Sequence, residues 1–244
     1  MRWILFQFRD PDDVMLEHEQ ACFLIHTGIA PEDLTFWNVL EDPPDAARIA
    51  EYDGYFMGGS GDYALSGKRH PGIELFIALV PRFVAWGKPM FGACFGLHLL
   101  IEGLGGAIGR IEDRLELGTY SMMLTEEGAA DPVFGHLPGM FDAQMGHHDW
   151  VLEMPPDNSV VVVAGSESAP CHAIRVGNAP IYATQFHPEL TEGELGYRLR
   201  IYDANYTEAN ADVDAIIAAF RPTPECLTLL SRFVEHALER QTNV

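Results

Sequence analysis

The alternation of hydrophobic and polar positions divides the first hundred residues into strand-length and helix-length segments. Short apolar runs of strand length lie at residues 2–8, 34–39, 55–57 and 89–93. Segments with helical spacing follow them at residues 11–27, 72–86 and 97–104. Pro11 and Asp12 open the first helix, and Pro81 predicts a kink or break in the second. This alternation is typical of a parallel sheet covered by helices on both faces.

The pattern changes between about residues 106 and 186. It predicts short strands separated by turns, in the segments GAIGRIE, LGTYSMMLT, HDWVLEM, SVVVVAGS, HAIRV and PIYATQF. We interpret them as antiparallel hairpins and the last central strands of the same sheet. The last sixty residues turn helical again, most clearly in DVDAIIAAF and ECLTLLSRFVEHALER, with Thr223 and Pro224 as N-cap and first residue of the final helix. One α/β domain is the simplest account.

Composition and charge narrow the classes of partner. The chain has 15 basic and 36 acidic residues among 244, for a net charge of −21, and such a surface repels nucleic acid and anionic membranes. Its four cysteines contain no C-x-x-C pair, so no zinc or disulfide framework is predicted. Without a signal peptide or a long apolar run, the sequence predicts a reducing, cytoplasmic setting. No metal or cofactor is predicted.

The segment KPMFGACFGLHLL, residues 88–100, predicts a strand, a sharp turn and a helix with Cys94 at the turn. Gly92 and Gly96 make room for a strained backbone at such a turn, as in a nucleophile elbow. A helix starting at Leu97 would direct its N-terminal dipole at the thiol and lower the thiol pKa, and the Phe95 N–H would form half of an oxyanion hole. A buried structural cysteine beside two packing glycines is the competing interpretation.

A nucleophilic cysteine needs a base and a group that orients the base. Of ten histidines, His187 directly follows an apolar strand, Pro188 stiffens the next turn, and Glu189 lies within reach of the imidazole. A glycine-rich turn, FMGGSGD at residues 56–62, also follows a strand. Because no P-loop pattern is present, a backbone N–H donated by Gly59 to an oxyanion fits this turn better than a phosphate site.

In this order and spacing, the Gly-Gly turn, G-x-C-x-G and His-Pro-Glu resemble the class I (triad) glutamine amidotransferase family, over about residues 50–190. The segment GHHDWVLEMPP is similar to that family too. The resemblance implies a mostly parallel, flavodoxin-like α/β sheet with a small antiparallel extension, a single domain over 1–244, a catalytic core at 50–190 and a helical segment at 191–244. It implies these roles: Cys94 as nucleophile, His187 as general base and acid, Glu189 as its orienter, and Gly59 and Phe95 as oxyanion donors.

The resemblance also implies a substrate site that includes Gly58, His98, His147 and Asp149. Two positions depart from the family pattern: His98 replaces the usual glutamine four residues after the nucleophile, and Ser60 replaces a frequent proline. His98 is either a substrate-site residue or a polar residue on the exposed face of its helix. His147 and His148 are adjacent on a predicted strand and point to opposite faces, so a hydrogen-bonding role suits His147 and Asp149 better than metal ligation.

Three functions remain open. The preferred prediction is a thiol-dependent hydrolase that cleaves a γ-glutamyl amide, either glutamine or a γ-glutamyl peptide or amine, through a Cys94 thioester. The second is a glutaminase subunit that passes ammonia to a separate synthase. The third is a non-catalytic binding or regulatory protein on the same fold. An α/β-hydrolase is disfavoured because Glu189 follows His187, and protease or chaperone relatives are disfavoured because Phe95 follows Cys94.

Overall fold

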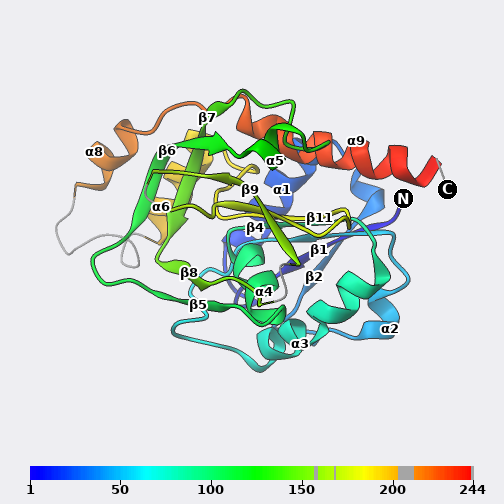
Figure 1. The fold of residues 1–244 in the computed structure, drawn as a ribbon. Coiled ribbons are helices and arrows are strands. Elements are labelled where there is room, and N and C mark those ends of the chain that lie inside the picture. Colours follow the sequence, from blue (N-terminus) through cyan, green and yellow to red (C-terminus); the bar gives the residue numbers. More distant parts are fainter. Residues whose placement is uncertain (157–158, 168, 203–211, 243–244) are drawn as a thin grey trace.

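A mixed nine-stranded sheet forms the centre of the molecule (Figure 1). The computed structural model describes residues 1–156, 159–167, 169–202 and 212–242. The strand order is β2-β1-β3-β4-β11-β10-β9-β6-β7. The first five are parallel, and they are β2 (Leu34–Asn38), β1 (Trp3–Gln7), β3 (Gly54–Met57), β4 (Met90–Ala93) and β11 (Ile181–Thr184). The predicted parallel half is therefore present.

The other four strands extend this sheet in antiparallel fashion. They are β10 (Ala173–Val176), β9 (Val160–Gly165), β6 (Glu116–Leu124) and β7 (Met140–His147). A separate two-stranded ribbon joins β5 (Ala107–Arg110) to β8 (Asp149–Glu153). The predicted α/β class with an antiparallel extension is confirmed, and the extension contributes four strands. No strand was predicted at β7, although Phe141, Ala143 and Met145 alternate there with Asp142, Gln144 and Gly146.

Helices cover both faces of the sheet (Figure 1). On one face lie α1 (Met15–Thr27) and α9 (Leu229–Thr242), and on the other lie α2 (Ala46–Ile49), α3 (Pro71–Trp86) and α4 (Phe95–Gly103). Alternate residues of β1 face the two layers: Trp3 and Leu5 pack toward α1 and α9, and Ile4 and Phe6 toward α3. The remaining described helices are α5 (Glu126–Ala129), α6 (Glu192–Ile201), α8 (Val213–Ala218), and the 3₁₀ turns η1 (Pro31–Asp33) and η2 (Cys226–Thr228).

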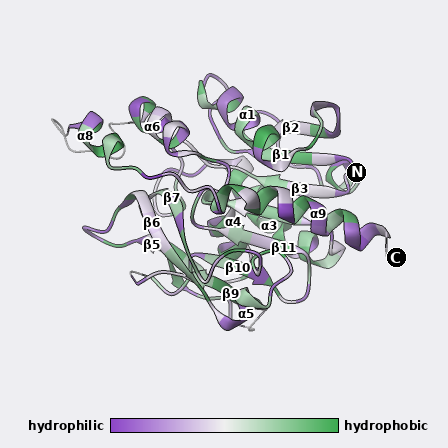
Figure 2. Cartoon of the chain, turned by 90° about the horizontal axis from the view of Figure 1, so that it is seen from above, coloured by the Kyte–Doolittle hydropathy of each residue, from purple (hydrophilic) through white to green (hydrophobic). Residues whose placement is uncertain are grey.

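Figure 2 shows the same layers by hydropathy: the central strands are white to green, and purple positions gather on outer helices and loops. In Figures 1 and 2, α6 and α8 lie at the end of the molecule that carries β6 and β7, and both chain termini lie at the opposite end. Within the described ranges, no helix combines the length and apolar character that crossing a membrane requires.

Three helix boundaries differ from the sequence predictions. The α3 helix continues through Pro81, because its buried face, including Phe76, Val80 and Phe83, outweighs the cost of about 3 kcal/mol for an interior proline. The α1 helix begins at Met15, where the Asp13 carboxylate accepts the Met15 N–H at 2.8 Å, and not at Pro11. Thr223 caps no helix, since η2 begins at Cys226 and α9 at Leu229.

Candidate active site

Three chemistry-bearing segments meet because their strands are neighbours in the sheet. Strand β4 lies between β3 and β11, and all three run parallel, with Met57 opposite Gly92 and Thr184 opposite Ala93. Their carboxyl ends therefore lie at one edge of the sheet. The glycine-rich turn follows β3, Cys94 follows β4, and the segment from Gln185 to Glu189 follows β11. This is where ligands bind in open parallel sheets.

Cys94 occupies the turn in a strained conformation. Its φ of 50° and ψ of −92° lie outside the ordinary regions for a residue with a Cβ. The Cys94 N–H donates to the Thr184 carbonyl at 2.7 Å, which ties the turn to β11. A Cβ at Gly92 would lie 2.9 Å from the Gly96 backbone, and a Cβ at Gly96 would lie 3.0 Å from the Met57 Cβ. Glycine at both positions therefore lets α4 begin close to β4 and β3. The sequence prediction of an elbow agrees with this geometry.

The α4 helix begins at Phe95, directly after the cysteine and two residues earlier than predicted. The N–H groups of a first helical turn have no partner within the helix. The Phe95 N–H is one of them, so it is placed as a donor beside the thiol. Two cavities border Cys94: a larger one of about 260 Å³ that includes Phe95, His98 and Asp149, and a smaller one of about 50 Å³ that includes Arg9, Leu117 and His187.

His187 and Glu189 form a buried ion pair after β11. The Nδ1 of His187 donates to Glu189 Oε1 at 2.7 Å, and Arg198 Nη1 donates to the same oxygen at 3.3 Å. Burial by itself would lower the pKa of His187, but the charge of Glu189 and the neighbouring Cys94 raise that pKa to about 9. Burial would likewise raise the pKa of Glu189, yet His187 and Arg198 lower it to about 2. At neutral pH this pair is therefore imidazolium and carboxylate.

His98 is buried, and it is not on an exposed helix face. Its Nε2 lies 2.9 Å from Gln185 Oε1, and the amide nitrogen of Gln185 lies 3.7 Å from the Cys94 sulfur. Burial lowers the pKa of His98 to about 4, so the ring is neutral. Because an amide oxygen only accepts, the Nε2 of His98 carries the hydrogen. His98 thus orients Gln185 toward the thiol and also lines the larger cavity.

The Gly59 N–H already has a partner in this structure, so its role as an oxyanion donor stays a prediction. It donates to Glu19 Oε1 at 2.7 Å. Glu19 is fully buried, and its carboxylate also accepts from Arg9 at 3.2 Å and from Gln7 at 3.0 Å. The buried, charge-assisted contacts of this carboxylate hold the glycine turn. An oxyanion at Cys94 could use the Gly59 N–H only after that bond opened.

Two of the predicted substrate-site residues have mainly structural contacts. The Gly58 N–H donates to the Phe6 carbonyl at 3.0 Å as part of the sheet, and Gly58 lines neither cavity. The Asp149 carboxylate accepts the Ser66 N–H at 3.0 Å and holds the loop after β3. Gly58 is thus held by strand pairing and Asp149 by the loop it closes, and their predicted part in substrate binding stays a prediction.

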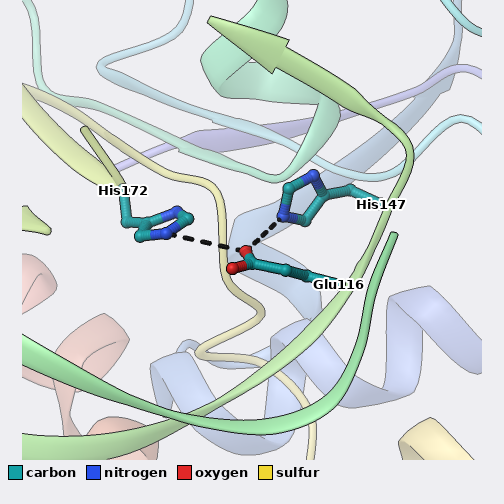
Figure 3. A group of neighbouring side chains, drawn as sticks. All are labelled: Glu116, His147 and His172. Atoms are coloured by element: carbon teal, nitrogen blue, oxygen red, sulfur yellow. Dashed lines mark hydrogen bonds and ion pairs between the residues drawn. The ribbon is translucent and has the colours of Figure 1, made fainter. Parts of the chain in front are cut away.

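The ring of His147 contacts buried polar groups, and the residue also borders the larger cavity. His147 Nε2 lies 2.9 Å from Glu116 Oε2 (Figure 3). Its Nδ1 lies 2.9 Å from the Asp149 carbonyl. His147 is buried, with 3% of its surface exposed, and both of its ring nitrogens contact groups inside the protein. The structure thus places His147 among buried polar partners, as the hydrogen-bonding role expected from the sequence requires.

Sequence reasoning missed several residues of the site. Gln185 stands two positions before His187, so the QFHPE segment itself contained that signal. Arg9 follows β1, and the carboxyl end of a parallel strand was a second available signal. Glu19 on α1 and Arg198 on α6 come from helices whose local patterns say nothing of the site. Only the packing of those helices against the strand ends brings them there.

The sequence profile of the family described as glutamine amidotransferase class-I matches residues 40–201. Among curated proteins, GMP synthase (glutamine-hydrolyzing) of Thermosipho melanesiensis is 36% identical over 136 residues, which are 55% of this chain and 25% of that protein. A subunit of the glutamine-hydrolyzing GMP synthase of Pyrococcus abyssi is 36% identical over 118 residues, 48% of this chain and 60% of that protein. The chain thus matches about a quarter of the length of the first relative.

Solved structures share the fold over nearly the whole chain. A glutamine amidotransferase from Thermotoga maritima superposes with a TM-score of 0.75 at 18% identity, covering 98% of each chain. A protein from Thermoplasma acidophilum, described as one subunit of a GMP synthase, gives a TM-score of 0.67 at 16% identity, covering 100% of this chain and 97% of the other. At these identities the superpositions establish the fold.

Proposed function

Since the chain belongs to the glutamine amidotransferase class-I family, we propose that it hydrolyses the γ-amide of glutamine with Cys94 as its nucleophile. The observation that carries this proposal is the position of Cys94 in its strained turn, bordering both cavities. The buried pair of His187 and Glu189 supports it. A protonated His187 beside Cys94 can give its proton to a leaving group, and Glu189 holds the imidazole in place for that step.

The first half-reaction forms a thioester. The Cys94 thiolate attacks the γ-carbonyl carbon of the substrate, and the carbonyl oxygen becomes an oxyanion that the Phe95 N–H stabilises. When the tetrahedral intermediate collapses, the carbon–nitrogen bond breaks. His187 transfers its proton to the departing nitrogen, so ammonia leaves and a glutamyl thioester on Cys94 remains.

The second half-reaction restores the enzyme. His187, now neutral, removes a proton from a water molecule that attacks the thioester carbonyl. Collapse of this second intermediate breaks the carbon–sulfur bond, which releases glutamate and returns the Cys94 thiolate and the His187 imidazolium. The small cavity on the His187 side suits this water, because about 50 Å³ of space exceeds the roughly 10–15 Å³ that one water needs.

The larger cavity is our candidate for the glutamyl moiety. At about 260 Å³ it is roomier than the cavity beside His187, and it has both polar and apolar walls. His98 and Gln185 form one side of the path from this cavity to the sulfur. His98 stands where the family pattern has glutamine, so a substituted γ-glutamyl amide is a second substrate class to be tested.

Transfer of ammonia to a separate synthase is the second candidate function. The names of two relatives favour it, because both are GMP synthases and one of them is a separate subunit of its synthase. A glutaminase that serves a partner should be slow alone. The bond between the Gly59 N–H and Glu19 supports a slow basal rate, since it removes one of the two oxyanion donors.

A substrate screen with the purified chain tests the proposed hydrolysis. Glutamine, γ-glutamyl dipeptides and γ-glutamyl alkylamines are supplied separately, and released glutamate is measured by a coupled assay. We expect glutamine to give the highest kcat/KM. Preference for a γ-glutamyl peptide or amine would keep the cysteine mechanism but change the substrate class. No glutamate from any of them, with Cys94 inert to iodoacetamide at pH 7, would support a binding protein instead.

Replacing Glu19 by glutamine should raise the basal rate. The substitution exchanges a charge-assisted hydrogen bond to Gly59 for a neutral one, which is weaker by about 1 kcal/mol. If opening of that bond limits the oxyanion hole, kcat rises by about 5-fold while KM changes little. Initial rates at saturating glutamine measure this. Glu17→Gln, on the same helix, serves as the control. A fall in kcat for Glu19→Gln would mean that the carboxylate holds the turn in its productive position.

A further inference from the structure

A buried cluster of one carboxylate and two imidazoles lies beneath the active site, outside the proposed reaction. Glu116 on β6, His147 at the end of β7 and His172 before β10 point toward one another (Figure 3). His147 Nε2 and His172 Nε2 lie 2.9 and 3.6 Å from the same oxygen, Glu116 Oε2. All three residues are buried, and one ligand atom from each lies within 4.8 Å of the others.

The hydrogen bond between His147 and Asp149 determines which ring nitrogen of His147 carries a hydrogen. The Asp149 carbonyl, 2.9 Å from Nδ1, can only accept, so Nδ1 carries a hydrogen. In a neutral ring, Nε2 then presents a lone pair to Glu116 Oε2, another electron-rich atom. Two acceptors at 2.9 Å repel each other unless a proton or a metal ion lies between them.

His172 places a second imidazole at the same carboxylate oxygen. An imidazole binds a metal ion through a nitrogen lone pair. The Nε2 lies 2.8 Å from the Ser166 hydroxyl, which can turn to donate or accept. Neutral imidazole nitrogens and a carboxylate oxygen are the donors that zinc takes in proteins.

We propose that Glu116, His147 and His172 bind one Zn²⁺ ion. Zinc takes histidine nitrogen and carboxylate oxygen at about 2.0–2.2 Å in a tetrahedron, which places neighbouring donors about 3.4 Å apart. The observed separations of 2.9 and 3.6 Å lie on either side of that value. The Ser166 hydroxyl or a water completes the coordination.

The surroundings of the cluster fit a structural ion. Trp150 packs against both rings, with centroids 4.8 Å from His147 and 6.3 Å from His172, and shields the site from solvent. The Asp149 carbonyl orients His147, as outer partners orient metal-binding histidines. His147 also borders the larger cavity, which provides a route for the ion. Bound zinc would join β6, β7 and the segment before β10.

Cobalt binding tests the proposal without any use of glutamine hydrolysis. The full chain is treated with a chelator, dialysed and titrated with Co²⁺, whose visible absorption reports tetrahedral nitrogen and oxygen ligation. We expect one equivalent to bind and Zn²⁺ to displace it. Glu116→Gln and His172→Phe should each weaken binding at least about 100-fold. His236→Gln, a histidine variant on α9 outside the cluster, should bind as the wild type does.

Thermal unfolding tests metal binding without relying on the absorption of bound cobalt. Zn²⁺ at about a hundredfold excess over Kd should raise the unfolding temperature of the wild type by roughly 5–10 °C and leave that of His172→Phe unchanged. Wild-type protein that binds no Co²⁺ at millimolar concentration would overturn the proposal. It would then identify the cluster as a proton-sharing His147–Glu116 pair. Equal binding by wild type and both cluster variants would overturn it too.

Discussion

Replacing Cys94 by alanine abolishes glutamate release while the protein stays folded. The variant lacks the atom that forms the thioester, and removing a nucleophile lowers kcat on the order of 10⁴-fold or more. The φ of 50° is as unfavourable for alanine as for cysteine, so the unfolding free energy should change by less than about 1 kcal/mol. Cys94→Gly should be the more stable of the two variants, since glycine adopts positive φ without strain.

The other cysteines provide the matched control. Burial raises the pKa of Cys171 to about 12, and it raises the pKa values of Cys22 and Cys226 as well. Iodoacetamide at pH 7 should therefore label Cys94 selectively, as peptide mass spectrometry can measure. Cys226→Ala should lose stability through a core cavity but keep its kcat. Full activity in Cys94→Ala would remove the proposed mechanism.

Replacing Glu189 by glutamine should lower kcat by on the order of 10²- to 10⁴-fold. The carboxylate accepts the Nδ1 hydrogen of His187 at 2.7 Å and so fixes the ring with Nε2 directed away from it. It also raises the pKa of His187 to about 9. Without that charge, burial lowers the pKa of His187, and the alkaline limb of the kcat profile moves toward neutral pH. The pH dependence of kcat from pH 5 to 10 measures both effects.

The same pair affects stability, with a direction that follows from its pKa values. His187 changes from 6.5 to about 9 on folding, so its contribution is complete below pH 6.5 and is lost as the pH rises through 9. Glu189 changes from 4.5 to about 2, so its contribution is complete above pH 4.5 and is lost as the pH falls through 2. The pair therefore stabilises the fold most between pH 4.5 and 6.5.

Urea unfolding at pH 6 and pH 9.5 tests that direction. The wild type should lose stability between these pH values, and Glu189→Gln should lose less because its His187 has no buried carboxylate partner. Glu192→Gln, three residues along the chain, should match the wild type in kcat and in both unfolding curves. If Glu189→Gln retained the wild-type kcat and alkaline limb, Glu189 would serve only to neutralise Arg198.

Local patterns predicted the parts of the site that a few neighbouring residues build. The elbow at Cys94 follows from two glycines and an apolar helix, all within five residues, and the structure has the strained backbone there. The His187–Glu189 contact spans two residues and could be predicted for the same reason. The β7 strand was not predicted, although Phe141, Ala143 and Met145 alternate with polar or small residues as strand residues do.

Contacts between distant segments could not be predicted from local patterns. His98 looked as compatible with an exposed helix face as with a substrate site, and its partner Gln185 lies 87 residues away. The N–H of Gly59, the predicted oxyanion donor, bonds to Glu19, which lies 40 residues earlier in the chain. Glu19 has no local signal, since a single charged residue on a helix is ordinary surface in most sequences. Gln185 stands in the segment that leads to His187, but nothing in that segment points to His98.

By itself, then, the sequence determined the α/β class, the family, and the cysteine and histidine turns, because each depends on spacing within one segment. Only the tertiary structure decided where those segments meet. Strand β11 pairs with β4, although almost ninety residues separate the two strands in the sequence. This pairing places His187 beside Cys94. The sheet order likewise gathers Glu116, His147 and His172 from three separate segments, because strand pairing, and not sequence proximity, sets which side chains share a buried space.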